Sequence, residues 1–301
     1  MEIITFDDLE YRVQPGWRVQ DIIPESSFTL LYAERGIGKS FLTLDWALCT
    51  LMGKQWHGHE VKFGEVLYII AEGEKRMWPR VQAWKSYYQY NHGVGGRVIP
   101  EAVQFHRPAN VTALLSELED RDEIINLVII DTVHRCFSGG DEDKAQDMGM
   151  WIEGVNRLQR QTDADVIAVH HAGWNASHER GSTALGAAAD TILRFRKGMG
   201  NDELVLSCEK QKDSEEFPDI RLHLTKHADS CILTSVDTPA PPEMRTLAVL
   251  VKMGGHATRD AWLAESRLPQ STWYRHVEVL RKQGKISEAG ENFVTSTHVR
   301  I

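Results

Sequence analysis

The sequence predicts an α/β fold with a mostly parallel, twisted sheet, followed by a small domain of a different class. Three observations support this prediction. Short apolar runs alternate with segments of helical periodicity through most of the chain, which is typical of a sheet with helices on both faces. Three prolines within residues 237–244 then indicate a linker. Beyond them the pattern changes to three helices and two short strands, which favours a winged helix-turn-helix. We therefore expect an α/β domain over residues 1–236, a linker over 237–244 and a winged helix over 245–301.

The α/β part begins with a polar strap over residues 1–27 and continues as an alternation of strands and helices. A strand is expected at each short apolar, β-favouring run, and a helix where apolar residues recur every three or four positions. Gly53 is the expected stop of the first helix. The expected elements are strands at 27–33, 65–74, 102–106, 125–135 and 164–173, and helices at 39–53, 75–90, 110–122 and 144–162.

The end of the α/β part lacks helices between its strands. Residues 190–213 are expected to form two strands, as a hairpin, and residues 220–236 one or two more. The small domain is expected to contain helices at 244–254, 258–268 and 269–286, followed by two short strands around Gly290. Thr258 is a suitable N-cap for the second of these helices.

The bulk composition indicates an ordinary soluble protein. The chain has 301 residues, 42% of them hydrophobic and 26% charged, with a net charge of −9. This balance excludes a basic coat over the whole surface, but it is compatible with a basic channel or loop. The cysteines lie far apart without zinc-binding spacing, which favours buried free thiols in a reducing cytosol. No apolar run reaches the roughly 18 residues of a membrane span, and the acidic N-terminus lacks signal-peptide features. We therefore expect a cytoplasmic protein without membrane contact.

Residues 33–40, AERGIGKS, match the phosphate-binding pattern G-x-x-x-x-G-K-[ST] except that Ala33 replaces the first glycine. A strand is expected before this loop and a helix after it, which is the setting that such a loop requires. Lys39 would reach the β- and γ-phosphates of a nucleotide, and the Ser40 hydroxyl would bind Mg²⁺. The loop residues expected to surround the phosphates are Arg35, Gly36, Ile37, Gly38, Lys39, Ser40 and Phe41. Alanine at position 33 removes the option of a positive φ there and little else.

Two carboxylates are expected to complete this site. Asp131 ends the apolar run LVIID, where a carboxylate would hold Mg²⁺ through water or through the Ser40 hydroxyl. Thr132 follows it, so a catalytic base has to come from another strand. Glu72, at the end of LYIIAEG, is the candidate because the C-terminal ends of adjacent parallel strands lie together. Glu74 is a weaker alternative.

Two adjacent histidines end the next apolar strand. Neighbouring residues on a strand face opposite sides, so His170 and His171 cannot bind one metal ion together. One of them is expected to pack in the core and the other to face the nucleotide. His171 is the favoured sensor of the γ-phosphate.

The segment after this strand, residues 173–190, is small, polar and rich in glycine and alanine. We expect either a loop that contacts DNA and responds to the nucleotide, or a plain surface loop. Arg180, Lys210 and Lys212 are cations near the expected strand ends. Each is a candidate for a finger that reaches the γ-phosphate of a neighbouring subunit, with a surface ion pair as the alternative.

These segments together resemble the RecA-like P-loop NTPases of the plasmid RepA type, which are hexameric replicative DNA helicases. The segments that carry the resemblance, within residues 15–225, are LLYAERGIGKSFLTLDWAL, VLYIIAEGE, LVIIDTVHRCFSGGDEDKAQDMG, VIAVHHAG, RGSTALGAAAD and CEKQKD. The resemblance implies a RecA-like core that binds and hydrolyses ATP with Mg²⁺, with Lys39 and Ser40 on the Mg-ATP.

The same resemblance implies roles for four further residues. Glu72 would be the catalytic glutamate, Asp131 the Walker B aspartate and His171 the sensor histidine. Arg180 would be the closest match to the arginine finger. The C-terminal winged helix lies outside the shared core.

Three functions are compatible with these patterns. The first is an ATP-driven helicase that forms a hexameric ring, binds ATP between subunits and threads single-stranded DNA through a locally basic channel. The second is a regulatory or accessory ATPase whose nucleotide state controls oligomerisation, with a winged helix that binds duplex DNA or a replication protein. A small-molecule kinase is the least favoured, because nothing resembles a lid or an acceptor pocket.

The second function draws on the basic character of the small domain. Its cations include Arg267, Arg275, His276, Arg281, Lys282 and Lys285. Ser271, Thr272, Trp273 and Arg275 would begin the recognition helix of a DNA-binding winged helix. A winged helix that docks a protein is the alternative.

Overall fold

The computed structural model of the chain consists of two compact units, Met1–Val236 and Asp237–Ile301, and each is described by itself. The residues that the structure describes are 5–7, 16–121, 124–171, 184–199, 202–235, 242–282, 284–289 and 292–295. Most of the expected linker, residues 237–241, lies outside these ranges.

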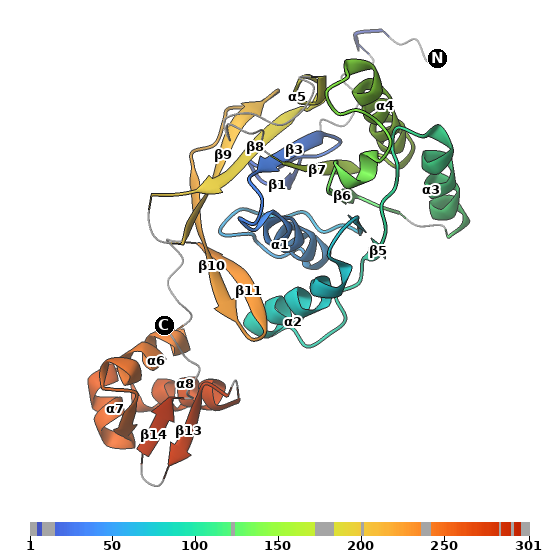
Figure 1. Cartoon of the computed structure of the whole chain (residues 1–301). Coiled ribbons are helices and arrows are strands. Elements are labelled where there is room, and N and C mark those ends of the chain that lie inside the picture. The colour runs from blue at the N-terminus through green and yellow to red at the C-terminus, as the bar shows by residue number, and fades with distance from the viewer. Residues whose placement is uncertain are drawn as a thin grey trace. The chain divides into compact units, whose positions relative to one another are not determined.

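Within its described residues, the first unit is built on one nine-stranded sheet in the order β11-β10-β9-β8-β3-β7-β6-β4-β5 (Figure 1). The strands are β3 (Phe28–Ala33), β4 (Val66–Ile70), β5 (Arg97–Ile99), β6 (Leu127–Asp131), β7 (Asp165–His171), β8 (Thr191–Lys197), β9 (Glu203–Gln211), β10 (Ile220–His227) and β11 (Ser230–Ser235). Neighbours from β8 across to β5 pair in parallel, whereas β8, β9, β10 and β11 pair antiparallel. The predicted α/β fold with a largely parallel central sheet is therefore confirmed.

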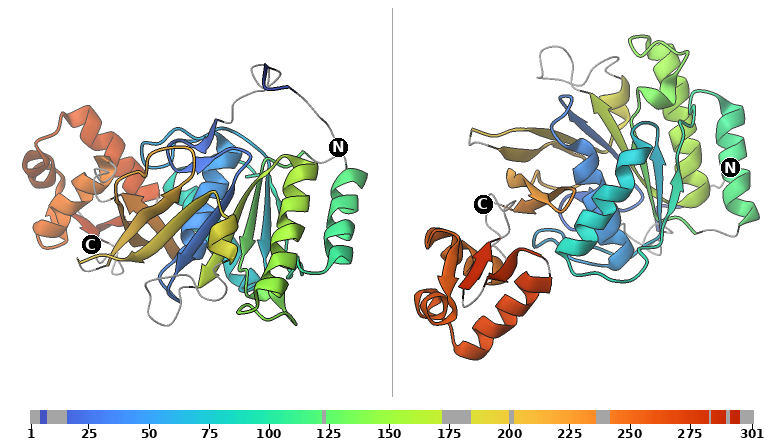
Figure 2. Two further views of the ribbon diagram at one scale, coloured as in Figure 1. Left: turned by 90° about the horizontal axis from the view of Figure 1, so that it is seen from above. Right: turned by 60° about the horizontal axis from the view of Figure 1, so that its bottom comes forward.

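Helices cover both faces of this sheet (Figure 1, Figure 2). α1 (Lys39–Met52) and α2 (Met77–Tyr87) pack on one face, and α3 (Pro108–Asp120), α4 (Ala145–Thr162) and α5 (Ala184–Ala188) on the other. Short turns of 3₁₀ helix lie at Glu74–Arg76 and Arg135–Phe137, and β1 (Trp17–Val19) pairs with β2 (Ile23–Pro24). At its β11 end the sheet curves around α1, so that β11 contacts both α1 and α2 (Figure 1). In the described ranges, every helix is too short or too polar to cross a bilayer.

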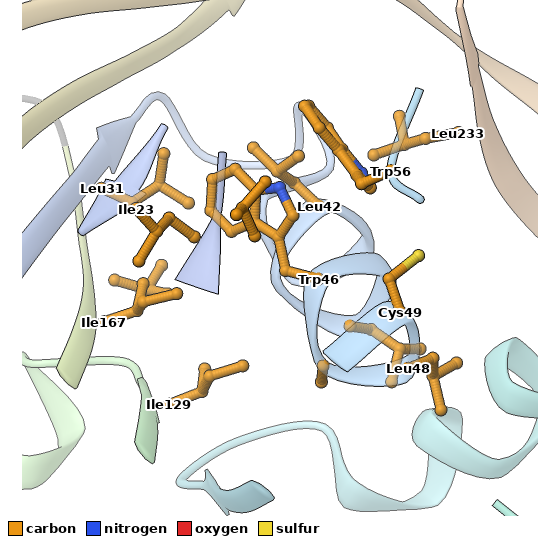
Figure 3. Close-up of a cluster of buried hydrophobic side chains, with 14 of the residues drawn as sticks. Ile23, Leu31, Leu42, Trp46, Leu48, Cys49, Trp56, Ile129, Ile167 and Leu233 are labelled. Carbon is orange, nitrogen blue, oxygen red and sulfur yellow. The ribbon is translucent and has the colours of Figure 1, made fainter. Parts of the chain in front are cut away.

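The core on the α1 face holds the helix that follows the expected phosphate loop. Leu31, Ile129 and Ile167 project from three strands toward Trp46 of α1 (Figure 3). Trp46 also meets Trp56 edge-on, with ring centroids 5.6 Å apart. Aromatic side chains of this size bury large apolar areas. Trp46 lies seven residues, or just under two turns, after the first residue of α1. Its packing therefore fixes the position of the N-terminal end of this helix.

One expected strand is wrong. Residues 102–106 form an irregular segment, and the edge strand is β5 at Arg97–Ile99. Phe105 is buried and packs edge-on against Trp151 of α4, with ring centroids 5.8 Å apart. The segment approaches α4 so closely that a Cβ at Gly154 would lie 2.2 Å from the Phe105 carbonyl oxygen. The apolar residues of this run therefore pack onto a helix instead of pairing in the sheet.

A buried carboxylate ties α1 to α2. Asp45 of α1 is 3% exposed and accepts hydrogen bonds from the indole N–H groups of Trp56, at 2.8 Å, and Trp84 of α2, at 2.7 Å. The Nε2 atom of His57 lies 3.4 Å from the same carboxylate. Because a buried carboxylate needs such partners, this network sets how the two helices lie against each other.

The second unit, over its described residues, contains three helices and a three-stranded antiparallel sheet in the order β12-β14-β13. The elements are α6 (Pro242–Lys252), β12 (His256–Thr258), α7 (Arg259–Ser266), α8 (Gln270–Lys282), β13 (Ile286–Ala289) and β14 (Asn292–Thr295). The Thr258 side chain caps α7 by accepting from the Ala261 N–H, as expected. The strand β12 was not expected.

The core of this unit contains two side chains that were expected on a DNA-facing surface. Trp273 is fully buried and meets Trp262 edge-on, with ring centroids 5.2 Å apart. His276 is also buried and its Nδ1 lies 2.8 Å from the Thr246 hydroxyl. Both side chains therefore stabilise the unit and are not available to a partner.

Candidate nucleotide-binding site

The phosphate loop connects the end of β3 to the start of α1. The backbone φ angles of Gly36 and Gly38 are +80° and +105°. Both lie in the left-handed region, where a side chain introduces strain, so glycine is required at these two positions. Ala33 has a different role, because it is the last residue of β3, is buried, and pairs with both β7 and β8. It has an ordinary extended conformation, so alanine is compatible with this loop.

Lys39 lies inside the loop as a nearly buried cation. Its Nζ donates to the carbonyl oxygens of Ala33, at 3.0 Å, and Glu34, at 2.7 Å. Its side chain is 7% exposed, and burial lowers the pKa of Lys39 to about 8. The carboxylates of Asp131 and Glu72 oppose this shift. An ammonium group held in this way is desolvated in advance, and phosphate oxygens would be favourable partners for it.

His171 at the end of β7 contacts this lysine. The Nζ of Lys39 lies 3.2 Å from His171 Nδ1, and since an ammonium group only donates, Nδ1 accepts and the proton is on Nε2. Burial, followed by the Lys39 charge, lowers the pKa of His171 to about 4, so the ring is neutral near pH 7. His170 is fully buried on the other side of the strand and accepts from the His171 N–H at 2.7 Å. The structure therefore separates the two histidines as expected.

The predicted magnesium ligands lie together on the other side of the loop. Asp131 at the end of β6 is 4% exposed and accepts hydrogen bonds from the hydroxyls of Ser40 and Tyr68, the latter at 2.9 Å. Burial raises the pKa of Asp131, while Lys39 and both hydrogen bonds counteract this rise. Tyr68 also meets the Thr43 hydroxyl at 2.7 Å. A carboxylate and a hydroxyl are hard oxygen ligands suited to Mg²⁺, so these residues fit the expected ion.

Glu72 lies beside Asp131 because β4 and β6 pair in parallel, with Ile70 opposite Asp131. Its carboxylate influences the pKa of both Lys39 and His171, which places it at the same site. One of its oxygens accepts from Arg135 Nε at 3.0 Å, and both side chains are exposed, by 44% and 58%. The structure thus brings a carboxylate to the predicted position and shows a partner that the sequence did not indicate.

The candidates for a finger lie elsewhere. Arg180 is outside the described residues. Lys210 donates to the carbonyl oxygens that end α5, including that of Ala189. Lys212 pairs with Asp190 at 3.3 Å, and its side chain is 62% exposed. Both lysines belong to the edge of the sheet where β3 begins, because Thr191 pairs with Gln211 and with Thr29.

Sequence reasoning missed three members of the site: Tyr68, Thr43 and Arg135. Tyr68 precedes the end of β4 by two residues, and Thr43 lies one turn after Lys39. Residues two apart on a strand, or four apart on a helix, lie on the same face, so both side chains are on the face of their element that borders the site. That spacing is the signal that could have identified them.

Comparison with known proteins identifies a family and shows a likeness to solved structures. The family model described as "AAA domain" matches residues 6–177, which is more than half of the chain. A chain in the crystal structure of the RadB recombinase is similar with a TM-score of 0.47 and 17% sequence identity, over 67% of this chain and 89% of that one. No curated protein matches the chain.

Proposed function

This chain belongs to the AAA domain family, and we propose that it is an ATP-hydrolysing motor of the hexameric replicative helicase type that moves on single-stranded DNA. The observation that carries the proposal is the convergence of Lys39, Ser40, Asp131, Glu72 and His171 at the C-terminal ends of adjacent parallel strands. In this proposal the loop residues 35–41 bind ATP, with Lys39 at the β- and γ-phosphates.

The remaining residues then have separate roles in hydrolysis. Ser40 and Asp131 hold Mg²⁺, which would neutralise phosphate charge. Glu72 orients the attacking water once its carboxylate leaves Arg135. The Nε2–H of neutral His171 donates to the γ-phosphate and so senses its presence.

The placement of Lys210 and Lys212 supports a site shared between subunits. Gln211, next to Lys212, lies level with Thr29 of β3, about five strand residues or roughly 17 Å along the strand from the phosphate loop. Lys210 lies level with Leu30, about four residues or roughly 13 Å from the loop. A finger role for either lysine would therefore be exercised on a neighbouring copy. We propose this role for Lys212 or for Arg180, within a hexameric ring.

The DNA part of the proposal draws on the resemblance to the plasmid RepA type. A strand-displacement assay on forked DNA tests it directly, with ATP, ADP and the Lys39→Ala variant compared. Displacement that requires ATP and Lys39 supports the motor. ATP hydrolysis without displacement, together with tight binding to one duplex sequence, would favour the second function instead.

The exposed face of α8 favours a regulatory, duplex-binding ATPase as the second candidate. Ser271, Tyr274 and Arg275 are exposed near its start, and Arg281 and Lys282 are exposed in its last turn. Together with the three-stranded sheet, this arrangement supports a winged helix whose recognition helix, α8, enters a major groove. Loss of duplex binding in Arg275→Ala, with ATP hydrolysis unchanged, would support this candidate.

A further inference from the structure

Arg80 on α2 is a cation whose position the predicted site does not explain. Its guanidinium lies over the ring of Phe41, with the Cζ atom 4.5 Å from the ring centroid. Phe41 directly follows Ser40, so Arg80 lies at the N-terminal end of α1, beside the phosphate loop. Burial raises the pKa of Asp131 and of Tyr68, and the Arg80 charge counteracts a small part of both rises. Arg80 is therefore close to the magnesium side of the site.

The contact between α1 and α2 positions Arg80 beside the phosphate loop. Phe41 and Asp45 are four residues apart on α1, and Arg80 and Trp84 are four residues apart on α2, so each pair shares one helix face. Arg80 stacks on Phe41, and the Trp84 indole donates to Asp45 at 2.7 Å one turn further along. Trp84 and Asp45 are both buried. Their hydrogen bond therefore fixes α2 against α1 and so keeps Arg80 over Phe41.

The guanidinium of Arg80 has no hydrogen-bonded or ionic acceptor among the described residues, although it is half-buried. A guanidinium carries five N–H donors in a planar fork that fits phosphate oxygens, and leaving it half-buried without acceptors is costly. Stacking on an aromatic ring satisfies its face but none of its donors. The arrangement is that of an anion site whose anion is supplied from outside.

We infer that Arg80 is a nucleotide-binding residue that contacts the phosphate groups of a bound nucleoside triphosphate within the same chain. It would approach from the side of Asp131. Trp84 and Asp45 are positioning residues, because they act by fixing α2. The inference rests on the proposed function in one respect, namely that residues 33–40 bind a nucleotide.

The test is nucleotide binding by the full chain without DNA, measured by fluorescence titration with mant-ADP and mant-ATP. Arg80→Met keeps a long apolar side chain over Phe41 and removes the charge. Lys85→Met removes one charge from the same helix, away from Phe41, and is the matched control. We expect Arg80→Met to weaken binding about ten- to a hundredfold, as for the loss of a charge-assisted hydrogen bond. We expect Lys85→Met to bind like the wild type.

Titrations with and without Mg²⁺ distinguish a direct contact between Arg80 and the phosphates from an indirect effect of Arg80 through Asp131. If Arg80 touches phosphate, the loss in Arg80→Met persists when EDTA removes Mg²⁺. Wild-type affinity in Arg80→Met, or a loss confined to the presence of Mg²⁺, would overturn the inference. Arg80→Lys, which keeps the charge and the stem, should recover part of the affinity even if the methionine variant folds poorly.

Lys39→Ala separates this inference from the proposed function. Binding that is lost in Lys39→Ala but unchanged in Arg80→Met would overturn the inference alone. A wild-type chain that fails to bind either nucleotide would overturn both.

Discussion

Replacing Lys39 with methionine is predicted to make the nucleotide-free protein more stable while removing nucleotide binding. Burial lowers the pKa of Lys39 from its ordinary 10.5 to about 8. At 1.36 kcal/mol for each tenfold change in proton affinity, the charged lysine costs the folded state about 3 kcal/mol near pH 7. Methionine removes that cost but also removes two hydrogen bonds to carbonyl groups, each contributing about 1 kcal/mol. The net gain is about 1 to 2 kcal/mol, or roughly 3 to 6 °C in Tm for a domain of this size.

The stability difference between Lys39→Met and wild type should change with pH in a defined direction. Between about pH 8 and pH 10.5 the unfolded chain binds the Lys39 proton and the folded chain does not, so wild-type stability rises with pH in this window. The Tm advantage of Lys39→Met over wild type should therefore shrink between about pH 7 and about pH 10. Thermal unfolding of both proteins without nucleotide measures it, with Lys226→Met, at an exposed lysine of β10, as control. A variant less stable than wild type at neutral pH, or a Tm advantage that does not change with pH, would show that burying the Lys39 charge does not cost stability.

Three further predictions follow from single positions. Ala33→Gly, which restores the glycine of the phosphate-binding pattern, should not tighten mant-ATP binding and should lower stability by about 1 kcal/mol in denaturant unfolding, because position 33 is a buried strand residue. Gly154→Ala should destabilise the protein by about 2 kcal/mol or more, since its Cβ would lie 2.2 Å from a carbonyl oxygen. Gly149→Ala on the same helix is the control, because its Cβ meets nothing, and it should stabilise the protein by up to about 1 kcal/mol. Equal Tm values for the two variants would contradict this prediction. Arg135→Gln should change stability by less than about 1 kcal/mol, because its ion pair is exposed, and should raise basal ATP hydrolysis by freeing Glu72; an unchanged or lower rate would argue that Arg135 assists catalysis.

Most of the fold was predictable because its strands and helices have strong local patterns. The strand expected within 125–135 contains an unbroken apolar run at residues 127–130, and buried parallel strands are expected to look like this. The segment 102–106 also contains apolar residues, but they pack on a helix instead of pairing in the sheet. Whether apolar residues pair in a sheet or pack on a helix depends on what lies beside them, here Gly154 of α4, and no local pattern reports this.

The candidate site was predictable where it depends on strand ends. Asp131, Glu72 and His171 were expected together because the C-terminal ends of parallel strands share an edge, and the structure has them at or just after the ends of the neighbouring strands β6, β4 and β7. The partners of these groups were not predictable, because they arrive from other elements at a tertiary contact. Arg80 is such a partner, since its position depends on a hydrogen bond between Trp84 and a carboxylate on another helix.

Steady-state ATP hydrolysis by the full chain, with and without single-stranded DNA, tests whether this chain is a DNA-stimulated ATPase. Wild type is compared with Lys39→Ala and Glu72→Gln. The account predicts that wild type hydrolyses ATP, that single-stranded DNA raises the rate, and that both substitutions abolish turnover. It further predicts that Glu72→Gln still binds mant-ATP, because its carboxylate acts on water and not on the nucleotide. A wild-type chain that binds ATP but never turns it over, with or without DNA, would contradict the account.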